Sequence, residues 1–120
     1  MRNARKRPLA VTVISCIYIL AGVGGMISHF PGFRAHPFEL GATAIELLSA
    51  LAIVAGVFML RGANWARWLA LAWMAFHVYV GALHGWQQAV THAVFLLVIA
   101  FFLLKKPEAE YFSSQGSQTV

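Results

Sequence analysis

The sequence has 120 residues, of which 60% are hydrophobic and only 11% are charged, and its formal net charge is +5 at pH 7. A water-soluble domain of this length could not bury so much apolar surface, because small folds leave a large share of their surface in water. Lipid is therefore the expected solvent for most of the chain. The basic residues stand at the ends of apolar segments and form no patch, so nucleic acid is not an expected partner.

Four apolar segments are expected to form helices, at residues 9–29, 39–60, 65–84 and 87–104. At about 1.5 Å per residue each covers about 27 to 33 Å, which matches a hydrocarbon core of about 30 Å. A continuous helix bonds its own backbone groups, so helices are favoured over a barrel in lipid. The sequence predicts an all-α integral membrane protein, an antiparallel four-helix bundle. Its parts are a basic cytoplasmic N-terminus (1–8), the transmembrane domain (9–106) and a polar cytoplasmic tail (107–120).

The first segment, 9–29, begins after Pro8, at a position where a helix tolerates proline. Cys16 is the only cysteine and lies inside this segment, so we expect no internal disulfide and interpret the thiol as a packing group. No small-residue cleavage site interrupts the segment, and a retained helix is expected rather than a removed signal peptide. Residues 30–38 carry three phenylalanines and are expected to form an outer loop along the membrane interface.

The second segment, 39–60, contains Glu46, a carboxylate at membrane depth. Such a group is costly unless it is paired, protonated or hydrated, which makes it a functional candidate. The rise of about 1.5 Å per residue places Glu46 about 10 Å inside the outer boundary, and His77 in the third segment lies at a similar depth. We therefore expect Glu46 and His77 to form an intramembrane polar pair, worth about 1 kcal/mol as a structural contact.

A short connection joins the second and third segments and is expected to form a cytoplasmic turn. Gly62 suits the end of one helix and Asn64 suits the cap of the next. Short connections force neighbouring helices to be antiparallel. The turn comprises Arg61, Gly62, Asn64, Trp65 and Arg67.

Several histidines fall near the predicted outer boundary and form a candidate ligand cluster. Imidazole and carboxylate groups suit zinc, copper or iron, although no compact ligand motif is present. Interfacial histidines that serve no ligand are the simpler alternative. The cluster consists of His29, His36, His84, His92 and Glu39.

The distribution of basic residues predicts the orientation of the chain. Of the nine Lys and Arg residues, all except Arg34 precede the first segment, flank the connection after the second, or follow the fourth. The positive-inside rule then places both termini in the cytoplasm.

Short motifs around this connection carry a family resemblance. LRGANWARWL occupies residues 60–69, WMAFH follows at 73–77, HAVF stands at 92–95 and YF closes the region at 111–112. With these motifs, most of residues 8–112 resembles a family of small uncharacterised bacterial four-helix membrane proteins. The resemblance implies a multi-pass protein of the bacterial inner membrane and carries no established activity.

Nothing in the sequence indicates an enzyme, because it has no nucleophile–base arrangement and no glycine-rich phosphate loop. We expect a non-enzymatic accessory or interaction subunit in the lipid bilayer, as a homo-oligomer or in a larger membrane complex, with no cofactor. One open alternative is an oligomeric proton-coupled small-molecule transporter that uses Glu46. All four prolines are expected outside helix interiors, which disfavours the broken helices of many transporters. The other alternative is a metal- or haem-binding membrane subunit.

Overall fold

The structure is a computed structural model that describes residues 7–105 and 109–112. Expectations for residues 1–6, 106–108 and 113–120, which include most of the basic N-terminus and of the polar tail, fall outside these ranges. Within the described ranges the long elements are four helices and there is no strand, which confirms the all-α fold. The helices are α1 (Leu9–Ala35), α2 (Leu40–Leu60), α3 (Asn64–His84) and α4 (Trp86–Leu104).

All four helices are long and apolar enough to cross a membrane. They contain 19 to 27 residues, and many large apolar side chains lie exposed on their outer faces. Exposure of this kind is stable when lipid is the solvent, because hydrocarbon tails solvate apolar side chains without cost. The arrangement is that of a multi-pass membrane protein.

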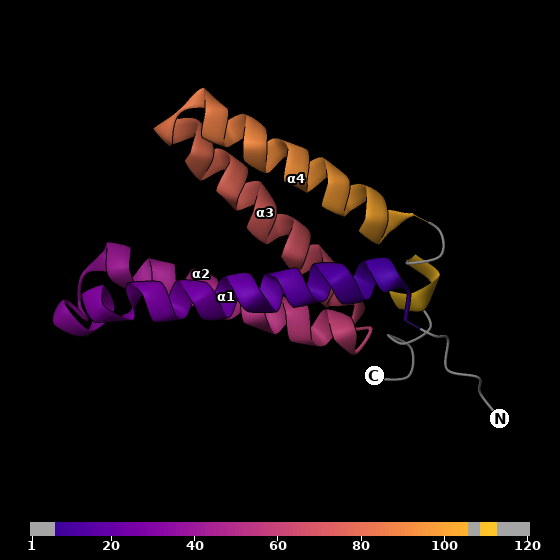
Figure 1. Cartoon of the computed structure of the whole chain (residues 1–120), viewed down its shortest axis with the longest axis horizontal. Coiled ribbons are helices and arrows are strands. Elements are labelled where there is room, and N and C mark those ends of the chain that lie inside the picture. The colour runs from indigo at the N-terminus through magenta and orange to yellow at the C-terminus, as the bar shows by residue number, and fades with distance from the viewer. Residues whose placement is uncertain (1–6, 106–108, 113–120) are drawn as a thin grey trace.

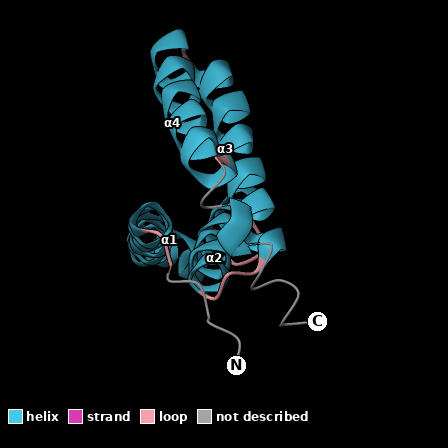
Figure 2. Ribbon diagram, turned by 90° about the vertical axis from the view of Figure 1, so that its right-hand side faces the viewer, coloured by secondary structure: helices cyan, strands magenta, loops and turns pink. Residues whose placement is uncertain are grey.

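The helices are arranged as two antiparallel hairpins (Figure 1). One hairpin consists of α1 and α2, and the other consists of α3 and α4. The second hairpin leaves the first at an angle, and a view turned by 90° shows the same separation (Figure 2). The hairpins meet near the turn between α2 and α3 and diverge toward their other ends.

Glycines allow the close contact inside the first hairpin. A Cβ atom added at Gly22 would lie 2.5 Å from Cγ1 of Ile53 and 2.6 Å from the carbonyl oxygen of Ser49. A Cβ atom at Gly56 would lie 2.7 Å from the carbonyl oxygen of Ser15. Because lipid offers no hydrophobic force between helices, this backbone-to-backbone approach supplies the packing energy of the pair.

The first helix is longer than predicted, because it continues from residue 29 to Ala35 and includes Pro31. Both the outer loop at 30–38 and the placement of every proline outside helix interiors were therefore wrong for this segment. A helix of 27 residues is about 40 Å long, so its last turns extend beyond a hydrocarbon core of about 30 Å. Residues 27–32 are all exposed there, and water can bond the carbonyl that the proline leaves unpaired.

Four of the five described Lys and Arg residues gather at one end of the molecule, which we call the basic end. Arg7 precedes α1, Arg61 and Arg67 flank the turn between α2 and α3, and Lys105 follows α4. Arg34 lies at the opposite end of α1, near the connection to α2.

A buried aromatic pair closes the basic end beyond α4. Phe112 is fully buried, and the hydroxyl of Tyr111 donates a hydrogen bond of 2.9 Å to the carbonyl of Leu60, at the end of α2. Nη1 of Arg67 donates to the carbonyl of Leu103 at 3.3 Å, and its guanidinium lies 5.5 Å from the Phe112 ring centroid. The polar tail predicted from residue 107 therefore contains, at its described residues, a packed turn.

Candidate functional site

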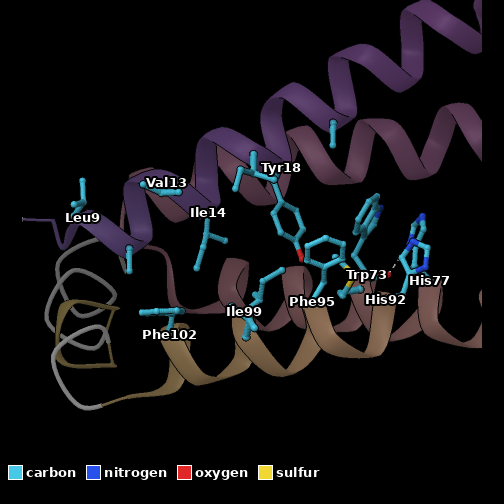
Figure 3. A pocket seen from close by; sticks show the side chains of 15 residues that line it. Leu9, Val13, Ile14, Tyr18, Trp73, His77, His92, Phe95, Ile99 and Phe102 are labelled. Atoms are coloured by element: carbon cyan, nitrogen blue, oxygen red, sulfur yellow. Dashed lines mark hydrogen bonds between the residues drawn. The ribbon is translucent and has the colours of Figure 1, made fainter. Parts of the chain in front are cut away.

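A cavity of about 660 Å³ lies between the two hairpins and is called here the inter-hairpin cavity (Figure 3). Its lining comes from α1, α3 and α4. The residues of α1 are Leu9, Ala10, Val13, Ile14, Ile17, Tyr18 and Ala21; those of α3 are Trp73, Met74 and His77; those of α4 are His92, Phe95, Val98, Ile99 and Phe102.

Two of the polar side chains in this lining are already committed to the backbone. The hydroxyl of Tyr18 donates a hydrogen bond of 2.7 Å to the carbonyl of Ala70, which ties α1 to α3. Nε1 of Trp73 donates a hydrogen bond of 2.8 Å to the carbonyl of Leu48, which ties α3 to α2. Both side chains have one N–H or O–H donor, so neither has a second proton to offer a ligand.

The two histidines of the lining each retain one unused ring nitrogen. Nδ1 of His77 lies 2.9 Å from the carbonyl oxygen of Trp73, and Nδ1 of His92 lies 2.8 Å from that of Gln88. A carbonyl oxygen only accepts, so Nδ1 carries the proton in each of these bonds. In the neutral ring Nε2 then holds a lone pair and acts as an acceptor.

The histidines lie together at one end of the cavity. The ring centroids of His77 and His92 are 5.9 Å apart, and the His77 centroid is 3.9 Å from that of Trp73. Figure 3 shows this group at one end of the lining, with Leu9 and Phe102 at the other. The cavity is thus apolar along its length and polar at a single end.

The predicted pair of Glu46 and His77 is not present in the structure. Glu46 is buried, with 9% of its surface exposed, and its Oε1 has no hydrogen-bond partner among the described residues. His77 instead faces α4, because Gly81, one turn further along α3, lets the backbone at Ala89 approach to within 3.1 Å of a Cβ position. The helix that His77 meets is therefore α4 rather than α2.

The outer ligand cluster is not brought together either. His29, His36 and Glu39 are exposed at the far end of the α1–α2 hairpin, whereas His84 and His92 belong to the α3–α4 hairpin, which diverges from it (Figure 1). Within residues 7–105 and 109–112, no group of three or more His, Cys, Asp or Glu side chains could hold a metal ion. The two members of the predicted cluster on the α3–α4 hairpin differ in their surroundings, because His92 lines the inter-hairpin cavity and His84 does not.

The turn at the basic end matches the sequence analysis in one feature and differs in another. Gly62 has φ 78°, the left-handed conformation that favours glycine where a helix ends. Asn64 does not cap α3, because Ala63 occupies the cap position and no side chain bonds the first turn. Trp65 packs on Phe58 with ring centroids 4.9 Å apart, and Arg67 is buried.

Sequence reasoning missed Tyr18 and Trp73 as members of this site. Trp73 stands one helical turn before His77, and that spacing places both side chains on one helix face, although no role in the site was assigned to Trp73. Tyr18 offered no such signal, since its partner is a main-chain carbonyl of α3.

No protein-family model matches the sequence, and no match was found among curated proteins or solved structures. The resemblance to small bacterial four-helix membrane proteins therefore stays a prediction. What the chain can do must be argued from the cavity itself.

Proposed function

We propose that the chain is a non-enzymatic accessory protein of the bacterial inner membrane that binds a slender apolar molecule in the inter-hairpin cavity. The proposed orientation places both termini in the cytoplasm, with the basic end on the cytoplasmic side. The observation that carries the proposal is the cavity between the hairpins, apolar except where His77 and His92 meet. Its volume of about 660 Å³ lies within the range of known small-molecule sites, roughly 300 to 1,000 Å³.

The size of the cavity favours a slender molecule over a partner helix. A transmembrane helix with a diameter of about 10 Å and a length of about 30 Å occupies roughly 2,400 Å³. That volume exceeds the cavity by more than threefold. A hydrocarbon chain is slender enough for a space of this volume, and some of the side chains that it would contact, such as Val13 and Phe95, are exposed.

A brominated alkane can test whether the cavity binds such a molecule. Trp65, Trp68 and Trp86 are exposed or lie away from the cavity lining, so replacing each with Phe leaves Trp73 as the reporter inside it. Titration of the detergent-solubilised protein with 1-bromododecane is expected to quench Trp73 fluorescence saturably. Quenching that rises linearly, as simple partition into the micelle requires, would contradict the proposal.

Two matched double variants make the test specific to the cavity. Val13 and Val98 line it from α1 and α4, and Val13→Phe/Val98→Phe is expected to fill part of its volume and weaken the quenching. Val23 and Val94 are exposed valines of the same two helices that do not line the cavity. Val23→Phe/Val94→Phe should therefore leave the quenching curve unchanged. Equal curves for the two double variants would place the bound alkane elsewhere.

One observation favours a second candidate, an oligomeric proton-coupled transporter. Glu46 is buried and its Oε1 has no hydrogen-bond partner among the described residues, and an ionisable side chain inside a membrane helix is a functional candidate. Glu46→Gln preserves the shape of the side chain and removes its titration. Proton flux into proteoliposomes should be lost in this variant if Glu46 is the carrier group. A flux equal to that of the unmodified protein would exclude the transporter.

A further inference from the structure

We propose that the molecule bound in the inter-hairpin cavity is a long-chain phenol, whose hydroxyl proton is accepted by Nε2 of His77 or His92. The proposal rests on the proposed function, since it names the class of molecule that the cavity takes. Long-chain phenols include the reduced forms of membrane quinones. Three features of this end of the cavity support a phenol: the hydrogen-bonding state of the histidines, their depth, and the aromatic side chains around them.

The hydrogen-bonding state selects a donor. The Tyr18 hydroxyl and the Trp73 N–H already donate hydrogen bonds to the carbonyls of Ala70 and Leu48. The two Nδ1 atoms of the histidines are likewise bonded to carbonyls of their own helices. Among the described residues of the lining, the strong side-chain hydrogen-bonding atoms that remain are acceptors: the two Nε2 atoms, and the Tyr18 oxygen, whose own proton is already donated. A ligand that offers only acceptors, such as a ketone or an ether, finds no proton there.

Depth selects a neutral head group. His77 lies seven residues before the end of α3 at His84, and His92 lies six residues after the start of α4 at Trp86. At about 1.5 Å per residue both are about 10 Å inside the helix ends. A phosphate or another permanently charged group would be costly at that depth without a paired opposite charge. A hydroxyl group carries a proton donor without a charge.

The surroundings of the histidines select an aromatic head. The Trp73 and His77 ring centroids are 3.9 Å apart with the ring planes tilted by 34°, and Phe95 and His92 line the same end of the cavity (Figure 3). Aromatic rings gain about 0.5 to 1.5 kcal/mol from offset or edge-to-face contacts with one another beyond simple burial. A phenol ring placed here makes those contacts, while its alkyl chain extends toward Leu9 and Phe102. Phe102 lies about 15 Å from His92 along α4 by helical rise.

The test compares 4-dodecylphenol with its methyl ether, 4-dodecylanisole, which has nearly the same shape and no O–H. Each is used to displace 1-bromododecane from the protein whose reporter is Trp73. One hydrogen bond of about 1 kcal/mol corresponds to about a fivefold difference in affinity, so the phenol should displace the probe at about fivefold lower concentration. The aliphatic alcohol dodecan-1-ol forms a third arm, and it should be weaker than the phenol because it lacks the ring.

Histidine variants then locate the acceptor. The quantity compared is the ratio of the displacing concentrations of the ether and the phenol. In His77→Phe/His92→Phe this ratio should fall to the value expected from partition of the two ligands into the micelle alone, while both ligands still bind. His84→Phe is the matched control, because Nδ1 of His84 makes the same bond to the Val80 carbonyl, at 2.8 Å, without lining the cavity. Its ratio should equal that of the unmodified protein. Helix content measured by circular dichroism establishes that each variant is folded. If the double variant does not fold, the single variants His77→Phe and His92→Phe are measured in its place.

The possible results distinguish a failure of the phenol proposal from a failure of the proposed function. If phenol and ether bind equally in the unmodified protein, or if the ratio survives in His77→Phe/His92→Phe, the assigned head group is wrong and the apolar binding site stands. If the phenol and dodecan-1-ol bind equally, the assignment of an aromatic head group is wrong and the assignment of a hydroxyl group stands. If 1-bromododecane never quenches saturably and neither aromatic ligand binds, the proposed function itself fails.

Discussion

His77 of α3 and His92 of α4 face each other across the second hairpin, with ring centroids 5.9 Å apart. The two residues are fifteen positions apart in the sequence and come this close because Gly85, with φ 152°, permits the sharp reversal between the helices and Gly81 permits their close approach. The polar centre of the molecule is therefore this histidine pair and not the expected pair of Glu46 and His77. It lies at one end of the inter-hairpin cavity, and Glu46 is separate from it.

The first prediction concerns the α1–α2 contact. Gly22→Ala should lower the free energy of unfolding by about 1 to 3 kcal/mol, because the new methyl group would overlap the Ser49 carbonyl and the Ile53 side chain. Gly24→Ala is the control, since a Cβ atom there meets nothing within 4 Å. Denaturation of the detergent-solubilised protein by sodium dodecyl sulfate, followed by circular dichroism, measures both. Equal stability of the two variants would show that the hairpin is not packed as described.

The second prediction concerns one of the hydrogen bonds between the two hairpins, from Tyr18 to the Ala70 carbonyl. Tyr18→Phe removes the hydroxyl that donates to the carbonyl of Ala70 and should cost about 0.5 to 1.5 kcal/mol in unfolding free energy. Tyr79→Phe should cost almost nothing, because that side chain is 63% exposed. The same denaturation assay applies. A loss as large for Tyr79→Phe as for Tyr18→Phe would argue that the tie between α1 and α3 is absent.

The third prediction concerns Glu46. Because its Oε1 is buried without a hydrogen-bond partner among the described residues, Glu46→Leu should raise the free energy of unfolding by about 1 to 3 kcal/mol. Glu39→Leu, at an exposed carboxylate, should change it little. A stabilised protein that has lost function would mark Glu46 as kept for activity. Destabilisation by Glu46→Leu would instead reveal a partner for this carboxyl group in the membrane.

The fourth prediction concerns the closure of the basic end. Phe112→Ala should destabilise the protein by about 3 to 5 kcal/mol, because the ring is fully buried and lies against Arg67. Phe38→Ala provides the comparison at a ring that is 99% exposed. Should Phe112→Ala fail to accumulate, Phe112→Leu is expected to show a smaller loss in the same assay. If neither Phe112 variant changes the free energy of unfolding, residues 109–112 do not hold the hairpins together.

The sequence predicted the helices well and their partners poorly. Apolar length gave four helices because lipid requires each crossing to satisfy its own backbone, and this constraint acts on each segment separately. The error at Pro31 arose because proline was treated as a stop, whereas α1 continues past it to Ala35 in largely exposed turns, where water can bond the carbonyl that the proline leaves unpaired.

The candidate site could be predicted only in part, for a related reason. His77 was recognised, but which helix it faces depends on rotation about the axis and on the angle between the hairpins, and neither leaves a mark in local sequence. The ties from Tyr18 and Trp73 end on main-chain carbonyls, which every residue possesses. Side-chain identity at the accepting positions therefore carries no signal of the contact. Glu46 was identified as exceptional, and its burial agrees with that interpretation although its predicted partner does not.

The origin of the cavity walls has a consequence for biosynthesis. The lining comes from α1, α3 and α4, with no contribution from α2, so α1 and α4 face each other across it. Each hairpin joins neighbours in the chain and can assemble as it leaves the ribosome. The cavity itself does not exist until α4 has also been made. A chain that ends after α3 would therefore lack one of its three walls.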